Sequence, residues 1–438
     1  MNAVVLAILV MLILSLVRMN VVLAIVIGAF VGGLTGGLSL TETIDIFSDG
    51  LGGSSKVALS YALLGAFAVT IAKTGLPNLL VEKALSFFQK EQGNKKQAVM
   101  KSLIIGVLLL MACMSQNIIP IHIAFIPILV PPLLILMNEL QLDRRMVATT
   151  ITFGLTVPYI LLPFGFGEIF HGIVKDNVES NGLTIDTLSF TNAMLIPVSG
   201  MVLGLLLSWF FYRKNRTYHS MKKKIKEEEG TTYTKRSIGF AFLGIVGALA
   251  VQIYTENMIA GAVVGILIIY LGGAIKWREF DDVLTDGMKM MAFIGFVMLA
   301  ASGFAEVLKA TGDVEALVMD AASVMDGSKG VAAAVMLLVG LFVTLGIGSS
   351  FSTVPIIATI YVPLAMELGF SPMAILSLVG TAAALGDAGS PSSDSTLGPT
   401  SGLNVDGQHN HIWDSVVPTF IFYNIPLLIF GWVAAMVL

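Results

Sequence analysis

The residues best suited to chemistry lie in Gly386–Asn404, a stretch rich in oxygen-bearing side chains. It contains two carboxylates, Asp387 and Asp394, and seven hydroxyl residues: Ser390, Ser392, Ser393, Ser395, Thr396, Thr400 and Ser401. Pro391 and Pro399 prevent an uninterrupted helix. Apolar segments long enough to cross a bilayer flank the stretch, and a broken polar segment at membrane depth is tolerated only where it lines a cavity or is buried in protein. The stretch is therefore predicted to bind a ligand.

Carboxylates, hydroxyls and free backbone carbonyls are the hard oxygen ligands that a small cation needs. An aspartate inside a membrane is costly enough to indicate a function. We therefore expect a site for a coupling ion, Na+ or H+, and assign to it Asp387, Ser390, Ser392, Ser393, Asp394 and Thr396. The alternative is a solvated turn between two helices, which the uncharged residues on either side disfavour.

A second broken element in the first half of the chain, Phe153–Glu168, is aromatic instead of oxygen-rich. Tyr159, Phe164 and Phe166 suit an organic substrate, and Glu168 suits a cationic group on it. The alternative is that these aromatic side chains only pack. We therefore predict that Tyr159, Phe164 and Glu168 contact the substrate.

A polar breakpoint precedes each broken element. The first is Ser115, Gln116 and Asn117, ahead of Pro120 and His122. The second comprises Ser349, Ser350, Ser352 and Thr353, ahead of Pro355. Breakpoints expose helix termini, and a helix N-terminus attracts a carboxylate, so both sets and His122 are predicted to bind the charged ends of a substrate. Alternatively, Gln116 and Asn117 satisfy neighbouring backbone groups, and His122 is an interior histidine.

The elements that must position these residues are membrane helices. The chain has 438 residues, of which 56% are hydrophobic and 12% charged, with a mean hydropathy of +0.87. Its apolar runs predict an all-α polytopic membrane protein with about 12 to 14 membrane segments, beginning with residues 2–17. The net charge of −4, with the basic residues in loops, suggests no nucleic-acid partner.

Other function classes lack support in the sequence. Cys113 is a single cysteine and cannot form an internal disulfide. His409 and His411 alone are weak as a metal site, and no nucleotide-binding domain is recognisable. No Ser/His or metal-ligand pair recurs at helical spacing, so an enzyme is not expected and neither is a cofactor beyond the coupling ion.

The chain divides into two related halves, 1–212 and 237–438, around a basic linker. Residues 213–236 carry nine Lys or Arg against three Glu, which places the linker in the cytoplasm. Six residues recur in the second half at one constant spacing: Glu42, Asp45, Asp49, Gly50, Thr74 and Gly75 match Glu279, Asp282, Asp286, Gly287, Thr311 and Gly312. The acidic loop of one half matches a basic loop of the other. This pattern predicts two inverted repeats with paired broken helices or re-entrant hairpins.

The signature Gly386–Thr396 resembles the Gly-Asp-x-x-Ser-Pro-x-Ser-Asp-Thr-Thr pattern of the bacterial sodium:proton antiporter family related to NhaC, within the ion transporter superfamily. Over its full length the chain is similar to the YuiF-type amino-acid transporters, through Asp49–Gly53, Ala62–Gly75, Ser115–Pro120 and Phe153–Thr156. The resemblance implies a scaffold that forms a homodimer and a transport domain that moves as an elevator. It also implies that Asp387, Ser390, Ser392 and Asp394 bind the cation. Ser395 departs from the usual threonine but keeps the hydroxyl.

Together these observations predict a secondary transporter of the bacterial plasma membrane that imports an amino acid, with histidine as one candidate, coupled to Na+ or H+. The main alternative is a Na+/H+ antiporter without an organic substrate. A channel or structural membrane protein is a further alternative, which the inverted repeat and the paired breakpoints disfavour.

Overall fold

The computed structural model describes residues 2–76, 79, 94–117, 125–185, 189–219, 234–255, 257–273, 275–314, 316–317, 319 and 328–438, and every regular element in these ranges is a helix. The first half contains α1 (Ala3–Leu16), α2 (Val21–Thr35), α3 (Leu40–Gly50), η1 (Leu51–Ser54), α4 (Ser55–Lys73), α6 (Asn94–Asn117), α7 (Phe125–Glu139), α8 (Arg144–Leu161), α9 (Phe166–Ser180) and α10 (Phe190–Phe211).

The second half of the chain ends in a long, irregular helix. It contains α12 (Lys235–Thr255), α13 (Met258–Leu271), η3 (Trp277–Glu279), α14 (Phe280–Ala310), α16 (Lys329–Ile347), α17 (Ser350–Glu367), α18 (Pro372–Ala384), η4 (Asp387–Gly389), α19 (Asp394–Leu403), η5 (His411–Val416), α20 (Val417–Thr419), η6 (Phe420–Asn424) and α21 (Ile425–Val437). In η5 and η6 the helix has π geometry.

The helix lengths are those of a membrane protein. Within the described residues seven helices are long and apolar enough to cross a bilayer, or up to nine if the bent pairs α3–α4 and α8–α9 each count as one span. Five shorter apolar helices accompany them. The sequence count of about 12 to 14 segments therefore includes helices too short to cross about 30 Å of hydrocarbon alone. The breaks that divide the chain into short helices contribute residues to the candidate site.

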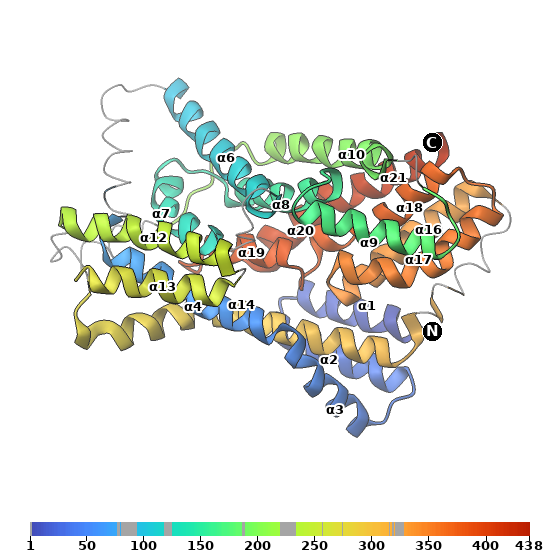
Figure 1. The fold of residues 1–438 in the computed structure, drawn as a ribbon, viewed down its shortest axis with the longest axis horizontal. Coiled ribbons are helices and arrows are strands. Elements are labelled where there is room, and N and C mark those ends of the chain that lie inside the picture. Colours follow the sequence, from blue (N-terminus) through green and yellow to red (C-terminus); the bar gives the residue numbers. More distant parts are fainter. Residues whose placement is uncertain are drawn as a thin grey trace.

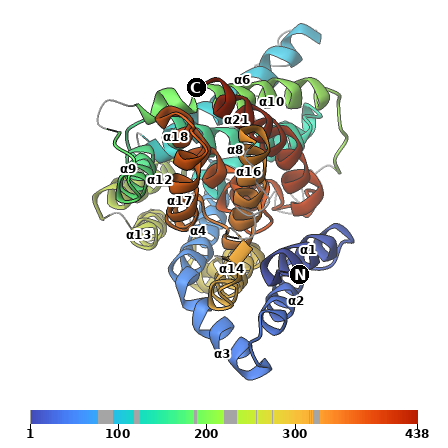
Figure 2. The same cartoon turned by 90° about the vertical axis from the view of Figure 1, so that its right-hand side faces the viewer.

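Two groups of helices lie side by side. Figure 2 shows α1, α2, α3 and α14 gathered on one side and α8, α10, α16, α18 and α21 on the other. In the first group α14 packs along α4, α2 contacts α14, and α13 contacts α4. The backbones of α4 and α14 approach closely, because a Cβ on Gly65 would lie 2.3 Å from the Gly287 carbonyl oxygen. Small residues allow such close helix contacts in membranes.

The second group contains two helix pairs that enter from opposite ends. In Figure 1, α6 and α7 lie toward one end of the long axis and α16 and α17 toward the other. The second helix of each pair packs on a broken element of the other half, since α7 contacts α19 and α9 contacts α17. The broken elements α8–α9 and α18–α19 therefore meet near the centre of the molecule.

Candidate functional site

The break between α18 and α19 is built around Gly386. Its φ of +91° is one that other residues rarely adopt, and a Cβ there would lie 3.0 Å from the Leu345 amide nitrogen and 3.1 Å from the Leu341 carbonyl oxygen of α16. Its own amide donates to Asn424 Oδ1 at 3.0 Å. Glycine thus lets the chain turn away from α18 against α16, and the turn delivers Asp387 to the centre of the helix bundle.

Asp387 is buried and accepts hydrogen bonds from three hydroxyls. Tyr159 in α8 donates to Oδ2 at 2.7 Å, Ser393 donates to Oδ1 at 2.5 Å, and Ser395 donates to Oδ2 at 3.1 Å. Because the Tyr159 proton is used in this way, the hydroxyl of Ser350, 3.0 Å away at the start of α17, donates to Tyr159. Hydroxyl groups thereby connect the Asp387 carboxylate to α8 and α19 directly, and to α17 through Tyr159.

Two helix N-termini converge on this network. Ser393 is the N-cap of α19 and accepts from the Ser395 amide at 3.1 Å, while its hydroxyl proton goes to Asp387. Ser349 is the N-cap of α17, and its side chain makes no capping hydrogen bond. Helix N-termini carry partial positive charge and free N–H groups, so both ends favour an anion at this point. The arrangement suits the Asp387 carboxylate and, at the uncapped end, a carboxylate brought by a ligand.

Aromatic side chains form one wall of the site. The ring of Phe351 in α17 lies 5.5 Å from that of Tyr159, 6.1 Å from that of Phe166 and 5.4 Å from that of Phe170. The break between α8 and α9, at Leu162–Gly165, places Tyr159 and Phe166 on this wall. Phe351 was not among the predicted site residues, although it directly follows the predicted breakpoint residue Ser350.

The predicted ion-binding residues occupy one short loop but contact Asp387 unequally. Ser393 does so directly, whereas Ser390 and Ser392 bond to each other with their hydroxyl oxygens 2.9 Å apart. Thr396 donates to the Ser390 carbonyl at 2.6 Å and so fixes the loop. Asp394 is half-buried at the start of α19. Ser395, whose hydroxyl donates to Asp387, was not among the predicted ion-binding residues.

The predicted substrate-binding residues are more dispersed. Tyr159, Ser349 and Ser350 lie at the site, and Thr353 is buried one turn into α17, with its hydroxyl 3.2 Å from that of Thr344. Ser115 is buried and donates to the Ala112 carbonyl of its own helix. Three predicted residues are exposed: Phe164, Glu168 and Ser352. His122 and the side chains of Gln116 and Asn117 lie outside the described residues.

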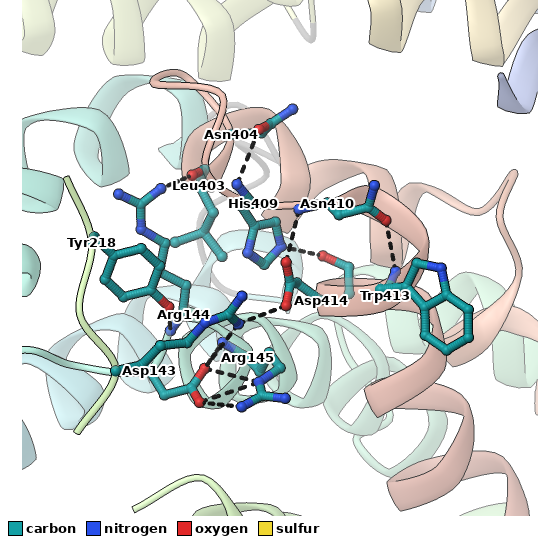
Figure 3. Close-up of polar contacts among 12 residues, drawn as sticks. Asp143, Arg144, Arg145, Tyr218, Leu403, Asn404, His409, Asn410, Trp413 and Asp414 are labelled. Carbon is teal, nitrogen blue, oxygen red and sulfur yellow. Dashed lines mark hydrogen bonds and ion pairs between the residues drawn. The ribbon is translucent and has the colours of Figure 1, made fainter. Parts of the chain in front are cut away.

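A charged cluster, unforeseen in the sequence, joins α8 to the segment after α19. Arg144 is fully buried and binds Asp406 through both terminal nitrogens and the Leu403 carbonyl at 2.7 Å. Figure 3 shows Arg144, Asp143 and Arg145 beside Leu403, His409 and Asp414. Burial alone would raise the pKa of Asp406, but Arg144 and Gln408 hold that pKa below its ordinary value. The signal for this cluster in the sequence was the presence of arginine and aspartate residues next to apolar segments.

A second row of ion pairs attaches the start of the linker to this cluster. Arg216 lies 2.7 Å from Asp414 and 3.8 Å from Asp143, and Asp143 pairs with Arg145 at 2.7 Å. The hydroxyl of Tyr218 accepts from the Arg144 amide at 2.9 Å. The cluster therefore fixes the ends of α8 and α19 and residues 216–218 relative to one another.

With this geometry in hand, the chain can be compared with known proteins. Residues 150–432 match the Na+/H+ antiporter family, and residues 2–88 match a family with the description "Na+-H+ antiporter family". A Bacillus subtilis protein with the name "Putative amino acid transporter YuiF" is 56% identical over 444 residues that cover 100% of both chains. A Vibrio parahaemolyticus protein, "Uncharacterized membrane protein VP2115", is 54% identical over 441 residues, also covering 100% of both chains.

Solved structures show a looser likeness. The structure of Neisseria gonorrhoeae MtrF, described in terms of a class of antimetabolite efflux pumps, has a TM-score of 0.42 and 12% identity over 95% of this chain and 94% of its own. The family match and the full-length identities show that the chain belongs to the Na+/H+ antiporter family, as a multi-pass transport protein of the bacterial inner membrane.

Proposed function

We propose that the protein is a cation-coupled secondary transporter that imports an amino acid, with Asp387 at the site of the coupling ion. The observation that carries this proposal is the Asp387 network, in which a buried carboxylate is held by the hydroxyls of Tyr159, Ser393 and Ser395. Hydroxyls orient a carboxylate without cancelling its charge. A buried charge is costly unless it is compensated, so Na+ or H+ is the natural ligand.

The substrate proposal rests on the other groups that meet at Asp387. The uncapped N-terminus of α17 suits a carboxylate, and the wall of Tyr159, Phe166 and Phe351 suits an organic body. A full-length relative carries the name of an amino acid transporter. Histidine is the first amino acid to test, because an imidazole stacks well on aromatic rings.

The contacts between the halves support the proposed mechanism of inverted repeats and an elevator movement. Helix α7 of the first half contacts α19 of the second, and α17 of the second half contacts α9 of the first. In the same way, α2 of the first half contacts α14, and α13 of the second half contacts α4. The group around α4 and α14 would form the scaffold and, in a homodimer, the interface. The group that contains α8 and α19 would carry the site across the membrane.

The test is thermal stabilisation of the purified protein by each standard amino acid, with NaCl or with choline chloride at equal ionic strength. A ligand that binds the folded state raises its stability by mass action. We expect one amino acid to raise the transition temperature, and Na+ to enlarge that shift. Asp387→Asn should abolish the sodium effect, whereas Asp45→Asn, at an exposed position, should leave it unchanged. An unaltered sodium effect in Asp387→Asn would contradict the assignment.

The family match favours a second candidate function, a Na+/H+ antiporter without an organic substrate. This function predicts stabilisation by Na+ alone and by no amino acid. In everted vesicles, added Na+ would then collapse a pH gradient with no amino acid present. If these two results occur together, the antiporter replaces the amino-acid importer.

A further inference from the structure

A continuous line of hydrogen bonds leads from the charged cluster to the break in α18–α19. His409 Nε2 lies 2.8 Å from the Ser415 hydroxyl, which lies 2.9 Å from that of Thr400. The Thr400 hydroxyl lies 2.8 Å from His411 Nδ1, and His411 Nε2 lies 2.8 Å from the Pro391 carbonyl oxygen. All four side chains are at least nine-tenths buried. The line ends between Ser390 and Ser392, in the loop that also holds Asp387.

The Pro391 carbonyl fixes the proton of the histidine beside it. A carbonyl only accepts, so His411 Nε2 carries the proton, and in a neutral ring His411 Nδ1 then accepts from Thr400. The Thr400 hydroxyl also lies 2.9 Å from the Thr396 carbonyl oxygen, and it is the donor toward Ser415 in this structure. A proton passes toward His411 in the other ordering, in which Ser415 donates to Thr400 and His409 Nε2 donates to Ser415. In that ordering both histidines are Nε2–H tautomers, and the donors point toward Pro391.

His409 stands at the far end of the line, beside the start of the basic linker. Gln408, its neighbour, bonds to the backbone of His219 through both its oxygen and its nitrogen. His409 Nδ1 is buried and has no hydrogen-bond partner among the described residues. In the ordering with His409 Nε2 as donor, this nitrogen is an acceptor. It is thus the position at which the line can receive a proton.

We propose that His409, Ser415, Thr400 and His411 form a proton relay that carries positive charge from the linker-bearing end of the molecule to the Pro391 carbonyl. A proton binds His409 Nδ1, and the Nε2 proton of His409 moves to Ser415. The Ser415 proton moves to Thr400, and the Thr400 proton moves to His411 Nδ1. His409 ends neutral with its proton on Nδ1, both hydroxyls keep one proton, and His411 becomes an imidazolium that still donates to Pro391.

The charged groups around the relay favour passage of a proton over its storage on His409. Asp414 in η5 favours a proton on His409, whereas Arg144 from α8, Arg216 and His411 oppose it. Burial lowers the pKa of His409 to about 3, so His409 is neutral at rest. Around His411 the line is completed by Thr400 from α19, and α14 contributes the uncharged ring of Phe293 at 6.3 Å.

Charge on His411 would oppose a cation in the same loop. None of the four side chains bonds to Asp387, so they act as positioning residues through Pro391. By linkage, a relay proton weakens Na+ binding by the factor by which Na+ weakens proton binding. The inference rests on the proposed function for the identity of this cation site. The relay therefore makes Na+ affinity depend on the pH at the linker-bearing end.

Substitution of Thr400 tests the relay without removing a titratable group. Thr400→Val deletes the hydroxyl at nearly constant volume, and Thr400→Ser keeps it. The apparent Kd for Na+ would be measured by thermal shift of the full-length protein at several pH values, with choline as the control cation. Where one proton competes with one Na+, each unit by which the pH falls raises the apparent Kd for Na+ by up to about tenfold. We expect His411→Gln to reduce this slope, because the ring that receives the relayed proton is lost. Thr400→Val should slow the response of Na+ binding to a pH jump, and Thr400→Ser should restore its rate.

Some of the slope belongs to Asp387 itself, so the comparison among variants decides. Equal slopes in wild type and His411→Gln, or an unchanged pH-jump rate in Thr400→Val, would overturn the relay while leaving the proposed function intact. If Na+ does not bind the wild type at any pH, the proposed function fails. The relay is then decided by 15N resonances of the two histidines. Nε2–H tautomers in wild type, with His411 altered in Thr400→Val and normal in Thr400→Ser, support it, and Nδ1–H tautomers overturn it.

Discussion

At the scale of the residue, hydroxyl groups hold the Asp387 carboxylate. Asp387 receives its three hydrogen bonds from Tyr159, Ser393 and Ser395. Tyr159 is the member that comes from another half of the chain. It also accepts from Ser350, so one phenol joins α8 and α17 to the break before α19.

Removal of the Tyr159 hydroxyl should weaken the cation site more than it weakens the fold. In Tyr159→Phe the ring contacts to Phe170 and Phe351 remain, but the carboxylate loses a charge-assisted donor worth about 1.5 to 3 kcal/mol. We expect the Kd for Na+ to rise by about 10- to 100-fold, measured by thermal shift against NaCl. The matched control is Tyr423→Phe, which loses a bond to the Thr149 carbonyl away from Asp387. Equal losses of affinity in both variants would refute the role of Tyr159.

His409 should make the stability of the protein depend on pH. Its pKa is lowered by burial to about 3, against about 6.5 in an unfolded chain. The unfolded chain therefore binds the extra proton first, so stability is unaffected above pH 6.5 and falls as pH drops from about 6.5 to about 3. The slope is up to about 1.4 kcal/mol per pH unit.

The measurement is the transition temperature of the purified protein across this range. His409→Gln should flatten the profile, because glutamine does not titrate. His219→Gln removes an exposed histidine and should leave the profile as in wild type. A profile that His409→Gln does not change would show that His409 is not a buried neutral group.

At the scale of the element, the sequence predicted the breaks but not what they bring together. Proline and glycine in the sequence indicate the interruptions at Leu162–Gly165 and Leu385–Ser393, because proline lacks a backbone donor and glycine allows unusual φ values. Tyr159 in α8 lies 228 residues before its partner Asp387 in the sequence, and Arg144 lies 262 residues before its partner Asp406. Contacts at such separations depend on tertiary packing that no local pattern records. Ser390 illustrates the same limit, because its hydroxyl turns to Ser392 and not to Asp387.

Gly386 should be the most sensitive position of the break. In Gly386→Ala the positive φ costs about 1 to 2 kcal/mol, and the new Cβ also crowds α16. Gly407→Ala has a similar φ cost, but nothing lies within 4 Å of its Cβ. We expect a larger fall in transition temperature for Gly386→Ala, together with loss of the sodium shift. If the two variants behave alike, the close approach to α16 does not matter.

At the scale of the whole molecule, helices enter the centre from opposite ends. Figure 1 places α6 and α7 toward one end and α16 and α17 toward the other. The charge bias of the sequence predicts that Arg213, Lys214 and Arg216, at the start of the basic linker, face the cytoplasm. The opposite orientation of the two halves stays a prediction from the same bias.

Cysteine labelling in intact cells would test that topology. In a Cys113→Ala background, a cysteine at exposed Asp45 or Ser328 should react with a membrane-impermeant thiol reagent added outside. A cysteine at exposed Arg213 or Lys276 should react only after permeabilisation. Lys276 and Asp45 labelled from the same side would contradict the predicted orientation of the halves.

The neutral donors around Asp387 have an electrical consequence. When the site is empty the carboxylate keeps its unit charge, and when a proton or a monovalent cation is bound the site is neutral. A membrane potential acts on a moving charge with about 2.3 kcal/mol per 100 mV. In an elevator of this kind the voltage would therefore drive the return of the empty carrier toward the outside, while the loaded carrier would cross without sensing the field.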